Sequence, residues 1–234
     1  MHDRTLTELA NDLAAKRVSA VELTKHFLAR IERFDDALNA FVDHAKGVRL
    51  GDGLDEETTM GPLVSAEQRE RVERFIEIGQ SEATLAVQGS RPTDPRLANG
   101  YFVPPTIFAD VDNSDTIARE EIFGPVMSVI PFASVEDVVE MSNDNAYGLA
   151  AAIWTNDIKK ALTTARALRA GVVWINDTQP APTEMPWGGT KQSGIGRELG
   201  DYGFNEYRQI KHVWQNTSTD RNGYLHFSAL SGNI

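Results

Sequence analysis

The chain has 234 residues, 41% of them hydrophobic, and a formal net charge of -11 at pH 7. This length and composition are ordinary for a globular protein with a buried core. The acidic charge repels phosphate backbones and anionic lipids, so neither nucleic acid nor a membrane is expected as a partner. No apolar run is long enough to span a bilayer, and the first ten residues lack the apolar stretch of a signal peptide. Because the sequence has no cysteine and no disulfide can form, we expect a cytoplasmic protein.

Residues 5 to 34 are expected to form a helical hairpin. Thr5 and Glu8 match the S/T-x-x-E capping pattern, a second such pattern opens at Ser19, and apolar residues follow each at helical spacing. The stretch over residues 5 to 43 resembles the N-terminal helices of amidase-signature enzymes, the family that includes the A subunit of the glutamyl-tRNA amidotransferase. The resemblance ends before the Ser-Ser-Lys triad of that family, so amidase chemistry is not expected.

From about Ala45 onward, strand and helix patterns alternate. Helices are expected after the capping residue Ser65 and over Val135–Asn143 and Ile158–Arg169. Strands are expected within TIFADV and over Ala83–Gly89, Val126–Phe132, Ala150–Trp154 and Val172–Ile175. The regular alternation from Val126 onward predicts a parallel α/β sheet with right-handed crossovers. Pro180 to Gly203 is expected to be a Gly/Pro-rich loop region, and Tyr207 to Trp214 a last strand before a polar tail.

The strongest motif is REEIFGPV, residues 119 to 126. It resembles a motif of the aldehyde dehydrogenase family, in which the glutamate at the position of Glu121 hydrogen-bonds the ribose beside the nicotinamide, and the ring at the position of Phe123 lines the nicotinamide site. A carboxylate can accept from two vicinal hydroxyls, and a flat ring can support a flat heterocycle. The resemblance therefore implies NAD or NADP as cofactor, with Glu121 and Phe123 as contacts. Considered without the family, an acidic pair before an apolar run is usually a solvated turn.

A second motif is PWGGTKQSGIGRELGDYG, residues 186 to 203. It resembles the late loop of aldehyde dehydrogenases, which borders the substrate tunnel and the subunit interface. Trp187 stands where phenylalanine is more usual in the family, and this form resembles betaine aldehyde dehydrogenases, so Trp187 is implied as a residue of the tunnel. The glycines do not have the spacing of a dinucleotide fingerprint, and tight turns explain them better.

Other residues offer no catalytic or metal site. The five histidines are scattered without metal-ligand spacing. Glu198 lies in GRELG, whereas the general-base glutamate of the family lies in an E-L-G-G context. The tract Trp174-Ile175-Asn176 has two interpretations: it supports the floor of the active site in the family, or it is a core tryptophan followed by an asparagine that ends a strand.

The family resemblance covers residues 45 to 215 and implies the C-terminal part of a three-layer, parallel-sheet catalytic domain. We expect an amidase-like hairpin over residues 1–44, a truncated catalytic domain over 45–205, and an oligomerisation-type strand with a polar tail over 206–234. Aldehyde dehydrogenases act through a cysteine thiolate, which this chain lacks. We therefore expect a family fragment that binds NAD or NADP weakly or not at all and does not oxidise aldehydes alone. The alternatives are a non-catalytic module that pairs through Tyr207 to Trp214 with itself or with a full-length aldehyde dehydrogenase, and the product of a rearranged gene.

Overall fold

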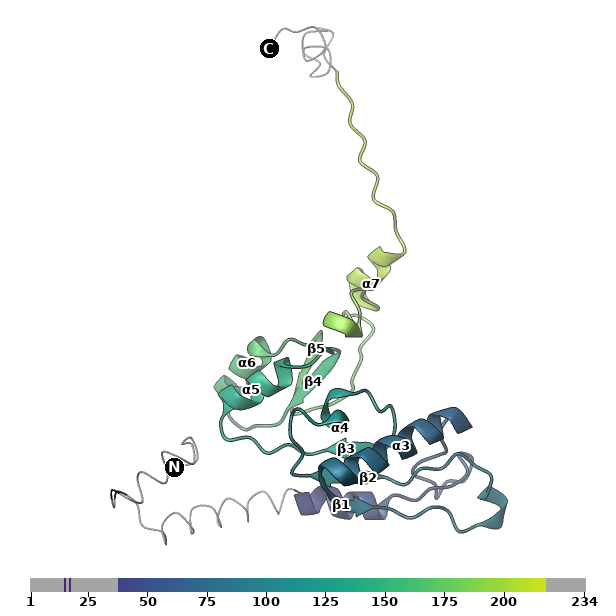
Figure 1. Ribbon diagram of the computed structural model, residues 1–234. Coiled ribbons are helices and arrows are strands. Elements are labelled where there is room, and N and C mark those ends of the chain that lie inside the picture. The colour runs from purple at the N-terminus through teal and green to yellow at the C-terminus, as the bar shows by residue number, and fades with distance from the viewer. Residues whose placement is uncertain (1–14, 16, 18–37, 218–234) are drawn as a thin grey trace.

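The computed structural model describes residues 15, 17 and 38–217 (Figure 1). The hairpin expected over residues 5 to 34 therefore lies outside the described part of the chain, apart from two single residues. Residues 38–47 form a helix whose Val42 and Ala45 are buried. Among the described residues, no helix is both long enough and apolar enough to cross a membrane.

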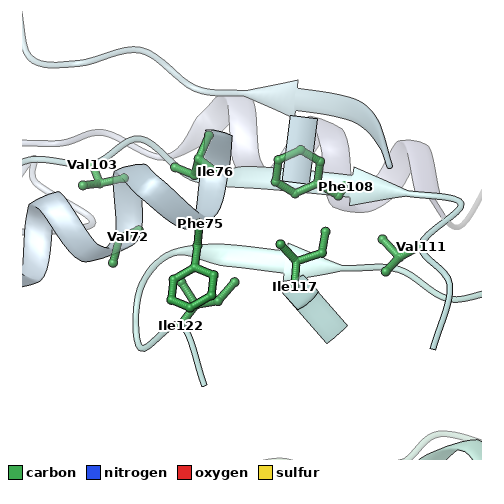
Figure 2. Close-up of a cluster of buried hydrophobic side chains, with 8 residues drawn as sticks. All are labelled: Val72, Phe75, Ile76, Val103, Phe108, Val111, Ile117 and Ile122. Atoms are coloured by element: carbon green, nitrogen blue, oxygen red, sulfur yellow. The ribbon is translucent and has the colours of Figure 1, made fainter. Parts of the chain in front are cut away.

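The main core lies between helix α3 and a three-stranded sheet. Helix α3, Ala66–Glu82, begins at Ser65, whose hydroxyl accepts from the Gln68 amide. The sheet has the order β1-β2-β3, with strands Thr84–Gln88, Thr106–Ala109 and Val126–Ser128. Strand β2 pairs antiparallel with β1 and parallel with β3, and the short helix α4, Thr116–Arg119, precedes β3. Figure 2 shows the buried side chains that join these elements: Val72, Phe75, Ile76, Val103, Phe108, Val111, Ile117 and Ile122.

A second unit follows along the chain. It consists of helix α5, Val135–Asn143, strand β4, Ala150–Ile153, helix α6, Ile158–Ala167, and strand β5, Val172–Ile175. Strands β4 and β5 are parallel, as expected for strands joined through a helix. The α/β class with parallel strand pairs is therefore confirmed, and so are the positions of α5 and β5.

Two expectations about the sheet are wrong. The strands from Val126 onward do not form one parallel sheet: β3 pairs with β2, and β4 and β5 form a sheet of their own. The strand expected over Val126–Phe132 is shorter: β3 ends at Ser128, and the backbone hydrogen bonds to the segment of β2 and Val111 end at Val129. Alternating hydrophobicity specifies which segments are extended, but a ladder also needs a neighbouring backbone within hydrogen-bonding distance. Beyond Val129, the described part of the chain supplies no strand beside β3.

The last part of the chain also differs from expectation. The Gly/Pro-rich region contains a 3-10 turn, Lys191–Ser193, and helix α7, Gly200–Glu206. The strand expected over Tyr207 to Trp214 is not formed, because these residues have no hydrogen-bonded neighbour strand among those described. Figure 1 shows residues 208–217 leading away from both sheets. These residues are all exposed. An extended segment becomes a strand only when another edge satisfies its backbone groups.

Candidate functional site

The turn that carries Glu121 and Phe123 connects α4 to β3. Ile122 between them is buried and belongs to the core, whereas Glu121 is exposed and the Phe123 side chain is 75% exposed. Phe123 has φ 57°, a left-handed conformation that is uncommon outside glycine. The buried isoleucine thus anchors the turn, and the two residues implied as cofactor contacts are directed to the surface.

Helix α3 holds this turn by its backbone. The Gln68 side-chain amide donates to the carbonyl oxygens of Ile122, at 3.2 Å, and Phe123, at 2.9 Å. The Arg71 guanidinium donates to the Glu121 carbonyl oxygen at 2.7 Å. These bonds satisfy three successive carbonyl groups that would otherwise rely on water, and they hold the backbone of the turn against α3.

Gly124 is required at the end of the turn because there is no room for a side chain. A Cβ atom at this position would lie 2.5 Å from Cγ2 of Val72, a fully buried residue of α3. Any larger residue would push the turn away from the helix, because close-packed interiors have little room to yield. The REEIFGPV motif is therefore a helix-packed turn, and the glycine explains part of the motif without reference to a ligand.

A cleft of about 660 Å³ lies beside this turn. Its lining includes Glu121, Ile130, residues of α5, and the segment from Asn145 to Ala151. Neither Phe123 nor Trp187 is among the lining residues. The structure thus brings one of the three residues implied by resemblance to the cleft and leaves the other two outside it.

Trp187 packs against Trp174 of β5. Their ring centroids are 5.8 Å apart with an interplanar angle of 37°, and the Trp174 indole N–H donates to the Pro180 carbonyl oxygen at 3.0 Å. The backbones of Trp187 and Glu198 exchange two hydrogen bonds of 2.7 Å. The contact between the two tryptophans fixes the shape of the late loop. Glu198 is held within the loop by its two backbone hydrogen bonds to Trp187.

The structure favours the structural interpretation of Asn176. Its side-chain oxygen accepts from the Thr155 backbone N–H at 2.8 Å, and its side-chain nitrogen donates to the Thr155 carbonyl oxygen at 3.0 Å. The oxygen and the nitrogen of the Asn176 side chain are thus both used to join the ends of β4 and β5. Trp174, two residues earlier, is only partly buried, so the expectation of a core tryptophan is not confirmed.

The contacts that attach the late loop to α5 were missed by sequence reasoning. The Lys191 ammonium group donates to the carbonyl oxygens of Asn143 and Asn145, both at 2.9 Å, at the C-terminal end of α5. A cation is favoured there by the helix dipole and by the unpaired carbonyl groups. Gly171 allows close approach, since a Cβ atom there would lie 1.8 Å from the Gly188 carbonyl oxygen. The tight turns expected of the loop glycines agree with the positive φ values of Gly188, Gly194 and Gly200.

The carboxylates with lowered pKa values hold structural contacts. Burial raises the pKa of Glu82, but hydrogen bonds from the Thr116 hydroxyl and the Ile117 N–H outweigh it and leave the pKa below its usual value. Hydrogen bonds from the Arg96 side chain and backbone lower the pKa of Asp94 in the turn of residues 94–97. Among the described residues, no group of three His, Cys, Asp or Glu side chains could hold a metal ion.

Comparison with known proteins decides the family. The sequence profile of the "Aldehyde dehydrogenase family" matches residues 23–213. The chain belongs to the aldehyde dehydrogenase family. It is 50% identical over 184 residues to the betaine aldehyde dehydrogenase of Bacillus subtilis, an alignment that covers 78% of this chain and 38% of that protein. It is 44% identical over 187 residues to the geranial dehydrogenase of Castellaniella defragrans, with 80% and 38% covered.

Solved aldehyde dehydrogenases share the fold. The betaine aldehyde dehydrogenase of Staphylococcus aureus in complex with NAD+ superposes with a TM-score of 0.77 at 42% identity, over 82% of this chain and 38% of that one. An aldehyde dehydrogenase of Bacillus cereus gives 0.75 at 48% identity, over 80% and 38%. The family resemblance and its betaine-type relatives are thus confirmed, and the chain spans less than two fifths of the length of these relatives. The family match begins inside the segment that resembles amidase-signature helices, and that second resemblance stays a prediction.

Proposed function

We propose that this chain is an aldehyde dehydrogenase module that contacts a nicotinamide cofactor weakly and does not oxidise aldehydes by itself. The proposal rests on one observation: the chain has no cysteine, but it still forms the turn from Glu121 to Phe123 that the resemblance implies as a cofactor contact. The family reaction is the NAD(P)-dependent oxidation of an aldehyde to a carboxylic acid. It needs a thiolate to add to the aldehyde carbon, and no other side chain here replaces a thiolate without large loss of rate.

The geometry of the turn fits the cofactor role that the resemblance implies. Because α3 fixes the backbone from Glu121 to Phe123, binding a cofactor there would need ordering of the two side chains but not of the backbone. The Glu121 carboxylate would accept hydrogen bonds from two ribose hydroxyls, and the exposed Phe123 ring would lie against the nicotinamide. The cofactor, when bound, supplies the acceptor for hydride. NAD is named by the solved relative from Staphylococcus aureus, and either NAD or NADP fits the residues present here.

Calorimetric titration of the purified chain with NAD tests this cofactor role. We expect a dissociation constant of about 1 mM or weaker, since only a few contacts are available. Glu121→Ala should weaken binding several-fold, and Phe123→Ala should do the same. The matched control is Glu120→Ala, which removes the neighbouring exposed carboxylate. Tight binding that is indifferent to Glu121→Ala would refute the proposed contacts.

Activity is tested directly with betaine aldehyde and NAD. The betaine-type relatives and Trp187 make this aldehyde the appropriate substrate for the assay. We expect no NADH formation above that of a heat-denatured sample. Turnover that scales with the amount of chain would contradict the proposed inactivity and would require a nucleophile other than cysteine.

A second candidate function is a non-catalytic interaction module. It is favoured by the segment after α7, where Tyr207 is 91% exposed, Ile210 fully exposed and Trp214 81% exposed. Large apolar side chains in such a run are typical of a protein interface. Its partner would be a second copy or a full-length aldehyde dehydrogenase, bound through Tyr207 to Trp214. Light scattering on the purified chain and co-purification with a full-length enzyme separate the two partners.

A third candidate is the product of a rearranged gene, suggested by the amidase-like stretch over residues 5 to 43. Reading the DNA across codons 40 to 50 in several isolates tests it, because a selected fusion keeps one reading frame. A junction that varies between isolates would favour rearrangement.

A further inference from the structure

The sequence contains two Asn-Gly pairs, at residues 99–100 and 222–223, and the structure describes the first of them. Asn99 and Gly100 follow a 3-10 turn, η1, Pro95–Leu97, and precede a buried segment that leads into β2. Asn99 is exposed, and its side chain makes no hydrogen bond within the described part of the chain. A free side-chain amide before a glycine is open to attack by the glycine nitrogen, because glycine has no Cβ atom to obstruct the approach.

The core requires glycine at position 100. A Cβ atom there would overlap the ring of Phe102, a side chain that is only 4% exposed. Close-packed interiors leave such a ring little room to move. The residue that makes Asn99 reactive is therefore fixed by packing, since a bulkier residue in its place would displace the Phe102 ring.

The backbone before the pair is held in a turn. Asp94 caps η1, because its carboxylate accepts from the Arg96 backbone N–H at 2.8 Å. The Gly100 N–H donates to the Leu97 carbonyl oxygen at 2.9 Å. The Gly100 nitrogen can therefore attack only after this bond opens, and local openings of this kind control reactions at protected backbone groups.

The backbone after the pair enters the main core. The Leu63 N–H donates to the Tyr101 carbonyl oxygen at 2.9 Å, and Phe102 is buried. Figure 2 shows Val103 in the cluster that packs against α3. Because these contacts fix residues 101–103, an extra atom in the main chain just before them would displace buried side chains.

We propose that Asn99 is a site of spontaneous deamidation, which proceeds through a cyclic imide formed with Gly100. The Gly100 nitrogen gives its proton to hydroxide and bonds to Cγ of Asn99. The bond from Cγ to the side-chain nitrogen breaks, and ammonia leaves with a proton taken from water, which regenerates the hydroxide. The product is a succinimide ring, and no atom is oxidised or reduced.

Water then opens the ring at either of its carbonyl carbons. Addition at Cγ breaks the bond from Cγ to the Gly100 nitrogen and gives aspartate, which adds a negative charge at an exposed position. Addition at the backbone carbonyl carbon of Asn99 gives isoaspartate, whose main chain runs through Cβ and Cγ and is longer by an atom. Because Phe102 and Val103 are buried, isoaspartate should weaken the core and aspartate should not.

Ageing of the full chain at mildly alkaline pH tests the site. Trypsin releases residues 97–119 as one peptide, in which mass spectrometry follows Asn99 and Asn113 together. Asn113 is the internal control, because Ser114 follows it and its side-chain amide donates to the Met141 carbonyl oxygen at 3.4 Å. We expect Asn99 to lose its amide nitrogen while Asn113 stays intact, at a rate that rises with pH. An isoaspartyl methyltransferase should label the aged peptide.

Variants separate the role of the side chain from that of the turn. Asn99→Gln keeps an amide but would have to close a larger ring, so the modification should disappear. Asp94→Ala removes the cap of η1, so Asn99 should deamidate several-fold faster. The matched control is Arg96→Ala, which removes the ion pair with Asp94 and keeps the capping bond from the backbone N–H, so its rate should equal that of the wild type.

Denaturant unfolding measures the consequence for the core. The aged wild type should unfold at a lower denaturant concentration than the fresh chain. Asn99→Gln aged in the same way should show no such loss, and this comparison removes the effect of changes elsewhere in the chain. Asn99→Asp, which carries the charge without the longer main chain, should unfold like the fresh wild type.

The opposite results overturn the inference at different steps. If Asn99 changes no faster than Asn113, the proposed site does not exist. Equal rates for Asp94→Ala and Arg96→Ala would mean that η1 does not control access to the Gly100 nitrogen. Equal unfolding of the aged wild type and aged Asn99→Gln would mean that the core takes up the longer main chain without loss.

Discussion

Gly79 in the last turn of α3 gives a sharp test of how the helix packs on the sheet. Substitution by alanine has two opposite effects on the free energy of unfolding. Alanine is favoured over glycine in a helix interior by about 1 kcal/mol. Its Cβ atom, however, would lie 2.7 Å from two ring atoms of Phe108, a side chain with no exposed surface. Overpacking of this kind costs roughly 1–3 kcal/mol, because the ring has no free space to enter.

We expect the packing term to exceed the helix term. Gly79→Ala should lower the free energy of unfolding by about 1 kcal/mol, which corresponds to a fall of roughly 2–4 °C in melting temperature for a chain of this size. Denaturant unfolding followed by far-UV circular dichroism measures it. The matched control is Gly47→Ala, at an exposed helix end where an added Cβ meets nothing within 4 Å. The control should be neutral or stabilising.

A second substitution isolates the contact. In a Phe108→Leu background the ring atoms nearest the added Cβ are absent, so Gly79→Ala should no longer be destabilising there. The difference between the two backgrounds is the coupling energy of the pair. If Gly79→Ala stabilises the wild type as much as the Gly47 control does, α3 does not pack on β2 as closely as described.

Three further predictions concern the contacts around the site. Thr116→Val removes a hydrogen bond that lowers the pKa of Glu82. That bond stabilises the folded protein when the Glu82 carboxylate is charged, above its unfolded pKa, and the stabilisation is lost when the carboxylate is protonated. Unfolding curves should therefore show the variant less stable than the wild type near pH 7, with a difference that shrinks as the pH falls below about 4.5. Lys191→Met should cost about 1–3 kcal/mol in denaturant unfolding, because it leaves two carbonyl groups at the end of α5 without their charged donor; no loss would mean that water replaces it freely. Ser134→Ala should cost about 1 kcal/mol through loss of the capping box of α5, and Ser134→Asn, which can still cap, should recover most of it.

Local patterns were sufficient for the individual elements. Helix α5 and strand β5 lie where the sequence predicts them, since capping residues and short apolar runs act over a few residues. The hydrogen bonds that hold the turn of residues 121–123 against α3 could not be predicted in the same way. Gln68 and Arg71 precede the carbonyl groups they bind by about fifty residues, and no periodicity links a side chain to a backbone group so far along the chain.

The sequence by itself determined the family, the α/β class, the lack of a thiol nucleophile, and the residues implied to face a cofactor. These follow from composition and from contiguous motifs such as REEIFGPV. Only the tertiary structure decided that the strands divide into two sheets, that Glu121 borders a cleft while Phe123 and Trp187 do not, and that Tyr207 to Trp214 pairs with no strand among the described residues. The physical reason is that strand pairing and cleft lining depend on which distant backbones meet, and that is settled by packing of the whole chain.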